Sequence, residues 1–172
     1  MVSAIGSVNK VLSFNYTDTF KRIYEPMLET APEYCYIHGC AKMENTIDFN
    51  NMVLGIDEYL DATERSKDIE FVRFKKFYQR IFKKTDYNYM NWVNKHAGTK
   101  KLFIIGHSLD VTDKDVLQDI LLQPAVETTI FYHNKKANAD QISNLVKVLG
   151  YDRLNALARG RSNGSITFQE LH

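Results

Sequence analysis

Short apolar segments alternate along the chain with longer amphipathic ones. The apolar segments are rich in strand-forming residues and predict strands at 10–14, 33–37, 52–56, 102–106, 126–132 and 165–171. The amphipathic segments carry apolar residues at helical spacing and predict helices at 17–28, about 61–97, 112–123, 138–149 and 151–160. Strands that alternate with helices in this way are typical of a mostly parallel α/β sheet.

Polar residues near the ends of the amphipathic segments indicate where the helices begin and end. We expect Thr17 to cap the first helix, Thr112 and Asp115 to form a capping box, and Asn138 to cap a helix that ends at Gly150. Five apolar residues of the segment 61–97 share one helix face, and we expect this stripe to pack against the core. The stripe consists of Phe71, Phe74, Tyr78, Ile81 and Phe82.

The length and composition fit one folded domain. The 172 residues are 44% hydrophobic and 25% charged, which is enough apolar material for one sizeable core. We therefore predict a single α/β domain over 1–172, with a three-layer, mostly parallel Rossmann-like sheet, helices on both faces and a helical insertion at about 58–97.

The charge balance and the apolar runs limit the classes of partner. A formal net charge of +1 provides no global attraction to nucleic acid or to an anionic membrane surface, so any such binding would have to be local. No apolar run approaches the length that crosses a bilayer. We expect a cytoplasmic protein without a membrane partner, and the two cysteines are consistent with a reducing compartment.

Polar side chains follow the predicted strands where each strand ends. These residues are Asn15, His38, Asp57, Ser108 and Asn134. In open α/β sheets, ligands bind beyond the carboxyl ends of the strands, so we expect these side chains to gather around a ligand.

Two common kinds of site compete with this interpretation. The cluster of Cys35, His38 and Cys40 has no second Cys/His pair, which a structural zinc site would need, and buried apolar cysteines are the plainer expectation. Gly106 and Ser108 match half of a serine-hydrolase elbow, but Asp110 occupies the second glycine position. We therefore predict no metal site and disfavour an esterase.

The acidic residues after this serine allow two interpretations. Asp110, Asp113 and Asp115 lie at a predicted helix start, where carboxylates stabilise the helix dipole and cap backbone amides. The same carboxylates would repel a phosphate, but they are able to accept hydrogen bonds from ribose hydroxyls.

A basic segment suggests a second kind of function, the binding of a macromolecule. Its six cationic residues alternate with aromatic ones and are Arg73, Lys75, Lys76, Arg80, Lys83 and Lys84. Such a segment is able to bind nucleic acid or an acidic partner. The alternative is a solvated helix face whose long basic side chains cover the apolar stripe.

Four of these motifs together resemble a known family. FNYTDT at 14–19, IHG at 37–39, GHSLDVTD at 106–113 and the strand that ends in YHN at 132–134 resemble, in type and order, the AbiH phage abortive-infection proteins. These are distant relatives of the sirtuin-like NAD-binding fold. The resemblance covers nearly the whole chain and implies an antiviral defence protein with a sirtuin-like sheet.

The resemblance also implies roles for individual residues. Asn15 would lie beside the nicotinamide ribose and His38 would act as a base, which together suit an NAD glycohydrolase-like reaction. The residues expected to contact NAD or a related nucleotide are Thr17, Asp18, Gly39, Gly55, Asp57, Gly106, His107, Ser108, Leu109, Asp110 and Asn134. A phage-derived trigger would activate such an effector. The alternative is a non-catalytic module that senses a nucleotide or binds a partner.

The amino-terminal part departs from the pattern of the family. A strand with a Gly-rich phosphate loop begins both AbiH-like and sirtuin-like proteins, and no such segment precedes 10–14 here. We therefore expect this chain to correspond to the C-terminal part of a longer protein and to lack the first strand. We also expect it to bind NAD weakly or not at all without that part.

Overall fold

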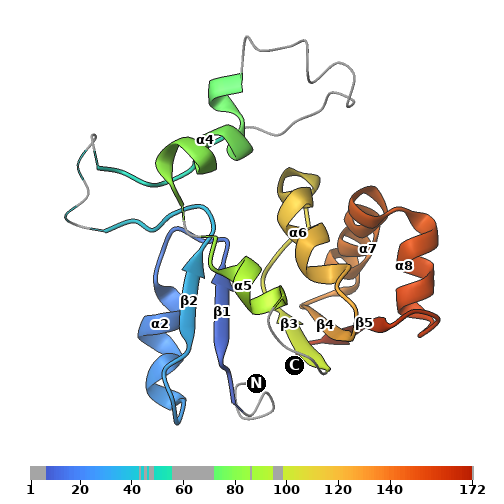
Figure 1. Cartoon of the computed structure of the whole chain (residues 1–172). Helices are drawn as coiled ribbons and strands as arrows, with labels where there is room; N and C mark the ends of the chain where they lie inside the picture. Colours follow the sequence, from blue (N-terminus) through green and yellow to red (C-terminus); the bar gives the residue numbers. More distant parts are fainter. Residues whose placement is uncertain are drawn as a thin grey trace. The chain divides into compact units, whose positions relative to one another are not determined.

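A computed structural model describes residues 7–42, 44, 46, 49–55, 72–85, 87–94 and 99–171 (Figure 1). The chain has an α/β fold, and the strands pair in parallel in both sheets of the described residues, as the alternation of strands and helices predicts. It forms two compact units, 1–92 and 93–172. The single sirtuin-like domain stays a prediction.

The first unit contains a parallel pair of strands. β1 (Lys10–Ser13) pairs with β2 (Glu33–Tyr36), and Ser13 lies opposite Tyr36 at the carboxyl edge. The connection between them holds α2 (Thr19–Ile23) and the 3-10 helix η1 (Glu25–Met27). Thr17 does not cap α2, because the helix begins after Asp18 and the Thr17 hydroxyl lies 2.9 Å from that of Thr19.

The third apolar segment is not a strand over its described residues, Met52–Gly55. It is an extended connection that crosses the end of β2, where the Val53 amide donates to the His38 carbonyl at 2.8 Å. The Tyr16 hydroxyl also donates to the Val53 carbonyl. Val53 is buried for this reason, together with Cys35 and Ile37.

The predicted long helix is broken in its described part. It contains the 3-10 helix η2 (Val72–Phe74), α4 (Lys76–Lys83) and α5 (Tyr89–Asn94). Lys84 takes a left-handed conformation with φ +50° and ends α4. Residues 58–71, 86 and 95–97 of the predicted insertion, which include Phe71, lie outside the described part of the chain.

The predicted packing of the apolar stripe is wrong. Ile81 and Phe82 are 67% and 73% exposed, whereas Arg80, on the opposite side of α4, is 2% exposed. The stripe identifies an amphipathic helix correctly. Its apolar face, however, is turned away from the other described residues of the first unit.

The second unit contains a three-stranded parallel sheet in the order β3-β4-β5. β3 is Lys100–Ile104, β4 is Val126–Tyr132 and β5 is Gly164–Glu170. Its helices are η3 (Val111–Asp113), α6 (Lys114–Leu121), α7 (Lys135–Leu149) and α8 (Tyr151–Ala158). α7 contacts both α6 and α8, and these helices pack beside the sheet (Figure 1).

Helical spacing explains the core of the second unit. The buried residues of α6 form one stripe, α6 contacts α7, and α7 contacts the central strand β4, whose inward residues are also buried. The side chains are Val116, Leu117, Ile120, Leu121, Ile130, Leu145 and Val148.

Two predicted caps of this unit are displaced. α7 begins one turn earlier than expected, because the Asn134 Oδ1, and not Asn138, caps it by accepting from the Ala137 amide at 2.8 Å. The expected Thr112–Asp115 box is replaced by Asp110, whose side chain accepts from the Thr112 amide at 3.0 Å at the start of η3.

Candidate functional site

The polar residues predicted for the first unit follow one edge of its sheet. Ser13 is paired with Tyr36, so the residues that follow β1 and β2 leave the sheet at the same carboxyl edge. Asn15 is exposed there, and its amide donates to the Ser13 Oγ at 3.2 Å. Its neighbours Thr17 and Asp18 lie before α2, where Asp18 forms an ion pair with Arg22 at 3.3 Å.

His38 occupies the interior of the same edge. It is 3% exposed, and its ring packs against the rings of Phe14 and Tyr16, with centroid distances of 5.7 and 6.5 Å. Its carbonyl accepts the hydrogen bond from Val53. The two residues expected to be catalytic therefore differ in access, since Asn15 reaches solvent and His38 does not.

Both glycines predicted for the first unit allow close approaches of the backbone. A Cβ on Gly39, which has φ +79°, would lie 2.2 Å from the Asn51 carbonyl oxygen. A Cβ on Gly55 would lie 2.5 Å from the amide nitrogen of Lys76. Each glycine thus has a structural reason for being there. Asp57 lies outside the described residues.

The predicted residues of the second unit form a bent loop after β3. Gly106 and Ser108 are exposed, whereas Leu109 between the loop and η3 is fully buried. Leu109 also has φ +58°, a left-handed conformation that is costly for a residue with a branched side chain. Its amide donates to the His107 Nδ1 at 2.8 Å, which helps to hold this conformation.

Two residues of α7 hold the loop from the other side. The Gln141 Nε2 donates to the His107 carbonyl at 3.0 Å and to the Phe131 carbonyl of β4 at 3.3 Å. The Asn144 Nδ2 donates to the Ser108 carbonyl at 3.0 Å. The sequence prediction missed both residues. A signal existed for Gln141, because it occupies a core position at helical spacing from Leu145.

The geometry of His107 argues against a serine hydrolase. Its Nδ1 accepts from the Leu109 amide, and its Nε2 lies 3.7 Å from the Asp113 Oδ2. Both ring nitrogens therefore face groups other than the Ser108 hydroxyl, and a nucleophilic serine requires a base within hydrogen-bond reach. The His107 ring instead connects the loop to the Leu109 amide and lies beside the Asp113 carboxylate.

Asn134 and this loop share the carboxyl edge of the second sheet. Ile104 at the end of β3 is paired with Ile130 of β4 in parallel register, so the residues after both strands emerge on the same side. Asn134 is exposed and uses its Oδ1 as the cap of α7. Gly106, Ser108 and Asn134 together form an exposed polar edge.

The basic segment of the first unit does not form a continuous cationic surface. Lys75 and Arg80 are buried, and the Lys83 Nζ donates to the Met52 carbonyl. Arg73 and Lys84 are exposed. Lys75, Arg80 and Lys83 are therefore not directed at solvent, and fewer cations of the segment 73–84 are able to contact a nucleic acid than the sequence suggests.

The cysteines are buried thiols. Cys35 and Cys40 are both buried and form no disulfide with each other, and burial raises the pKa of the Cys40 thiol. In the part of the chain that the structure describes, no three His, Cys, Asp or Glu side chains are grouped as metal ligands.

Among the described residues, we find no helix with the length and apolar character needed to cross a membrane.

Comparison with known proteins supports the resemblance seen in the motifs. No curated protein and no solved structure matches the chain. The sequence profile of the family described as "Bacteriophage abortive infection AbiH" matches residues 3–133, about three-quarters of the chain. The match includes the carboxyl edges of β1, β2, β3 and β4 described above. The chain therefore belongs to the bacteriophage abortive infection AbiH family.

Proposed function

We propose that the chain performs its phage abortive-infection role by binding a ribose-bearing nucleotide, with NAD as the first candidate, at the loop 106–110. The observation that carries this proposal is the conformation of Leu109, a buried non-glycine residue with φ +58°. Such a conformation costs about 1–2 kcal/mol and persists only where the surroundings impose it. Strained residues of this kind cluster at ligand sites.

The hydrogen bonds around Leu109 hold the loop 106–110 so that Gly106 and Ser108 are exposed to solvent. Hydrogen bonds from Gln141 and Asn144 hold the backbone carbonyls of His107 and Ser108, and the Leu109 amide holds the His107 ring. The fixed backbone leaves the Ser108 side chain on the surface. Ligand-binding loops commonly combine a backbone that a rigid scaffold holds in place with polar side chains that reach solvent.

The exposed groups match the chemistry of a ribose. The Ser108 hydroxyl both donates and accepts hydrogen bonds, and the Asn134 amide nitrogen is a donor that its capping bond does not use. The Asp110 carboxylate caps η3 through one oxygen, and its acidic character suits a hydroxyl donor better than a phosphate. The proposal therefore concerns the ribose-bearing part of the ligand.

One observation favours the second candidate function, a sensor that binds a nucleotide without cleaving it. His38, the expected base, is 3% exposed behind Phe14 and Tyr16. A general base must reach the proton that it removes, either directly or through one water molecule. Hydrolysis of NAD would require this ring to become accessible, whereas binding would not.

Nuclear magnetic resonance titration tests the binding step. Because the sequence predicts weak binding, the method must detect millimolar dissociation constants. We expect NAD and ADP-ribose to shift the amide signals of 106–110 in the chain, and Ser108→Ala to reduce these shifts. Ser143→Ala is the matched control, since Ser143 lies exposed on α7 and bonds only within its helix. Equal shifts in both variants, or shifts elsewhere only, would contradict the proposal.

A cellular experiment separates the effector from the sensor. NAD concentration and phage plaque numbers are measured in cells that express the complete protein or its Asn15→Ala variant. An NAD-consuming effector loses both NAD depletion and protection in this variant, whereas a sensor retains protection if binding survives. Asn9→Ala is the control, because Asn9 is also exposed but precedes β1 at the opposite end of the strand.

A further inference from the structure

α4 is an amphipathic helix whose polar face is directed inward. Arg80 is almost completely buried, and Lys75 immediately before the helix is buried as well. The large apolar residues of the opposite face are exposed. Surface helices of globular proteins normally have the reverse orientation, so this arrangement needs an explanation.

Contacts of the polar face hold α4 in this orientation. The Gln79 Oε1 accepts from the Leu54 amide at 3.0 Å, and the Lys83 Nζ donates to the Met52 carbonyl. Gly55 approaches the start of the helix so closely that a Cβ there would lie 2.5 Å from the Lys76 amide nitrogen. Polar side chains of α4 therefore satisfy the Met52 carbonyl and the Leu54 amide of the connection 52–55, and this requires the polar face of the helix.

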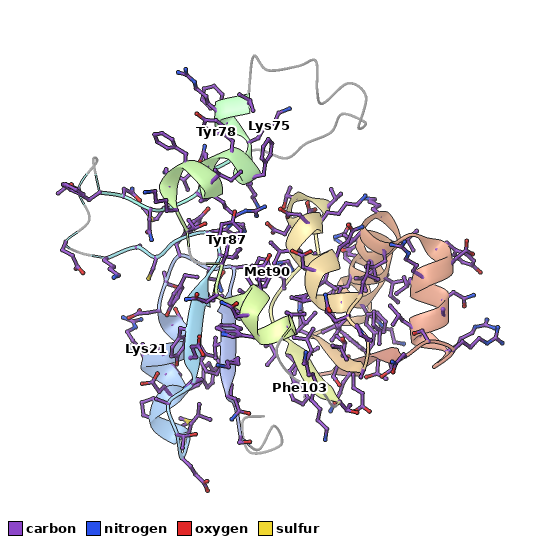
Figure 2. The ribbon with its side chains drawn as sticks, in the orientation of Figure 1. Lys21, Lys75, Tyr78, Tyr87, Met90 and Phe103 are labelled. Carbon is purple, nitrogen blue, oxygen red and sulfur yellow. The ribbon has the colours of Figure 1, made fainter. Side chains whose placement is uncertain are left out.

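The opposite surface, which we call the apolar face of α4, consists of Phe77, Ile81 and Phe82 of α4 together with Phe74 at the end of η2. Phe77 and Ile81 lie one helical turn apart, and Phe82 stacks on Tyr78 at a centroid distance of 6.1 Å. Figure 2 shows Tyr78 on α4 and Lys75 at its start. A group of large apolar side chains exposed together on one element marks an interaction surface.

The charges beside this face determine the kind of partner. Arg73 and Lys84 are exposed at its two ends, and the segment 72–85 contains no acidic residue. A partner must therefore combine apolar material with negative charge. A second copy packed antiparallel would place Arg73 of one chain near Lys84 of the other, and such like-charge pairs are costly.

We propose that the apolar face of α4 docks onto the surface of a bilayer that contains anionic lipids. Short amphipathic elements with Phe on one side and basic residues beside them insert at the boundary between headgroups and acyl chains. Ile81 favours acyl chains over nucleic acid, since an aliphatic side chain cannot stack on a base. The small net charge excludes only a global attraction, and this attraction is local.

Vesicle flotation tests this proposal with the intact chain. We expect the chain to float with vesicles of phosphatidylcholine and phosphatidylglycerol, and much less with phosphatidylcholine alone. The double variant Ile81→Ser/Phe82→Ser should lower the partition coefficient at least tenfold. Met27→Ser is the matched control, because Met27 is 69% exposed on η1 of the same unit and should leave flotation unchanged.

A second variant tests the role of charge. Arg73→Gln/Lys84→Gln should weaken binding to anionic vesicles about 30-fold, which corresponds to about 1 kcal/mol for each basic residue near the surface. Because all four substituted side chains are exposed, circular dichroism should show unchanged folding.

Four results would overturn the assignment to lipid. The first two are absence of flotation and equal flotation of the apolar-face variant and the control. A third is a dimer in sedimentation velocity that the same variant dissociates, which would assign the face to a second copy. The fourth is tight, salt-dependent binding of a single-stranded RNA oligomer that requires Phe77, since this would assign the face to nucleic acid.

Discussion

Gly39→Ala tests whether Gly39, in the motif IHG at 37–39, is needed for the close approach of the Asn51 backbone and not for contact with a ligand. A Cβ on this residue would lie 2.2 Å from the Asn51 carbonyl oxygen, whereas real Cβ contacts are essentially never shorter than 3.0 Å. The connection that carries Asn51 would have to move by at least about 0.8 Å. Such a movement pulls Asn51 and Val53 away from their hydrogen bonds to Cys40 and His38.

The cost of this substitution has two parts. Alanine at φ +79° costs about 1–2 kcal/mol, and each of the two hydrogen bonds contributes about 0.5–1.5 kcal/mol. We therefore expect the free energy of unfolding to fall by about 2–5 kcal/mol. Gly160→Ala is the control, because Gly160 has φ +62° but no atom within 4 Å of the added Cβ. It should lose only about 1–2 kcal/mol, from the backbone conformation.

Urea denaturation measures the total cost of each substitution, and amide hydrogen exchange shows whether the hydrogen bonds near Asn51 are lost. Exchange of the Val53 amide, which is bonded to the His38 carbonyl, reports the local opening. If both alanine variants lost the same free energy, or if the Val53 amide kept its protection in Gly39→Ala, the close approach of Asn51 would not be the reason for this glycine.

Three further predictions concern individual side chains. Ser108 should not react with a fluorophosphonate probe, because both nitrogens of His107 face other groups; labelling that Ser108→Ala removes would refute this. Burial and then the hydrogen bond to Glu25 raise the pKa of Tyr34, so its contribution to stability is present below about pH 10 and is lost as pH rises through the folded pKa. Glu25→Gln should lower the pKa in an ultraviolet titration, and an unchanged pKa would contradict this cause. Burial also raises the pKa of the Cys40 thiol, so iodoacetamide should modify it slowly until urea unfolds the chain, and rapid modification of folded protein would count against its burial.

Local patterns predicted most of the elements correctly in the second unit. The apolar runs at 102–106, 126–132 and 165–171 correspond to β3, β4 and β5, because each run has more strand-forming residues than any competing pattern. The pattern was misleading at 52–55, whose residues form an extended connection that crosses the end of β2. An apolar run indicates burial, but it does not indicate whether a neighbouring strand is available for pairing.

The order of the motifs predicted which polar residues share a sheet edge but not which of them reach solvent, and their role as a site stays a prediction. Parallel pairing brings the ends of neighbouring strands to one edge, so the order of motifs was sufficient to place Asn15 near His38, and Ser108 on the same edge as Asn134. Access depends on residues from other segments. The Val53 amide, 15 residues away along the chain, donates to the His38 carbonyl, and the rings of Phe14 and Tyr16 pack against the His38 ring; no local pattern contains that information.

By itself, the sequence determined the family, the alternation of strands with helices and the polar strand ends, because these depend on residue type and on short-range order. Tertiary structure alone decided three other features: the burial of His38, the support of the Leu109 conformation by Gln141, and the outward direction of the apolar face of α4. The physical reason is the same for all three. Helical spacing shows that a helix has two faces, but long-range hydrogen bonds to backbone groups, such as that from Leu54 to Gln79, decide which face turns inward.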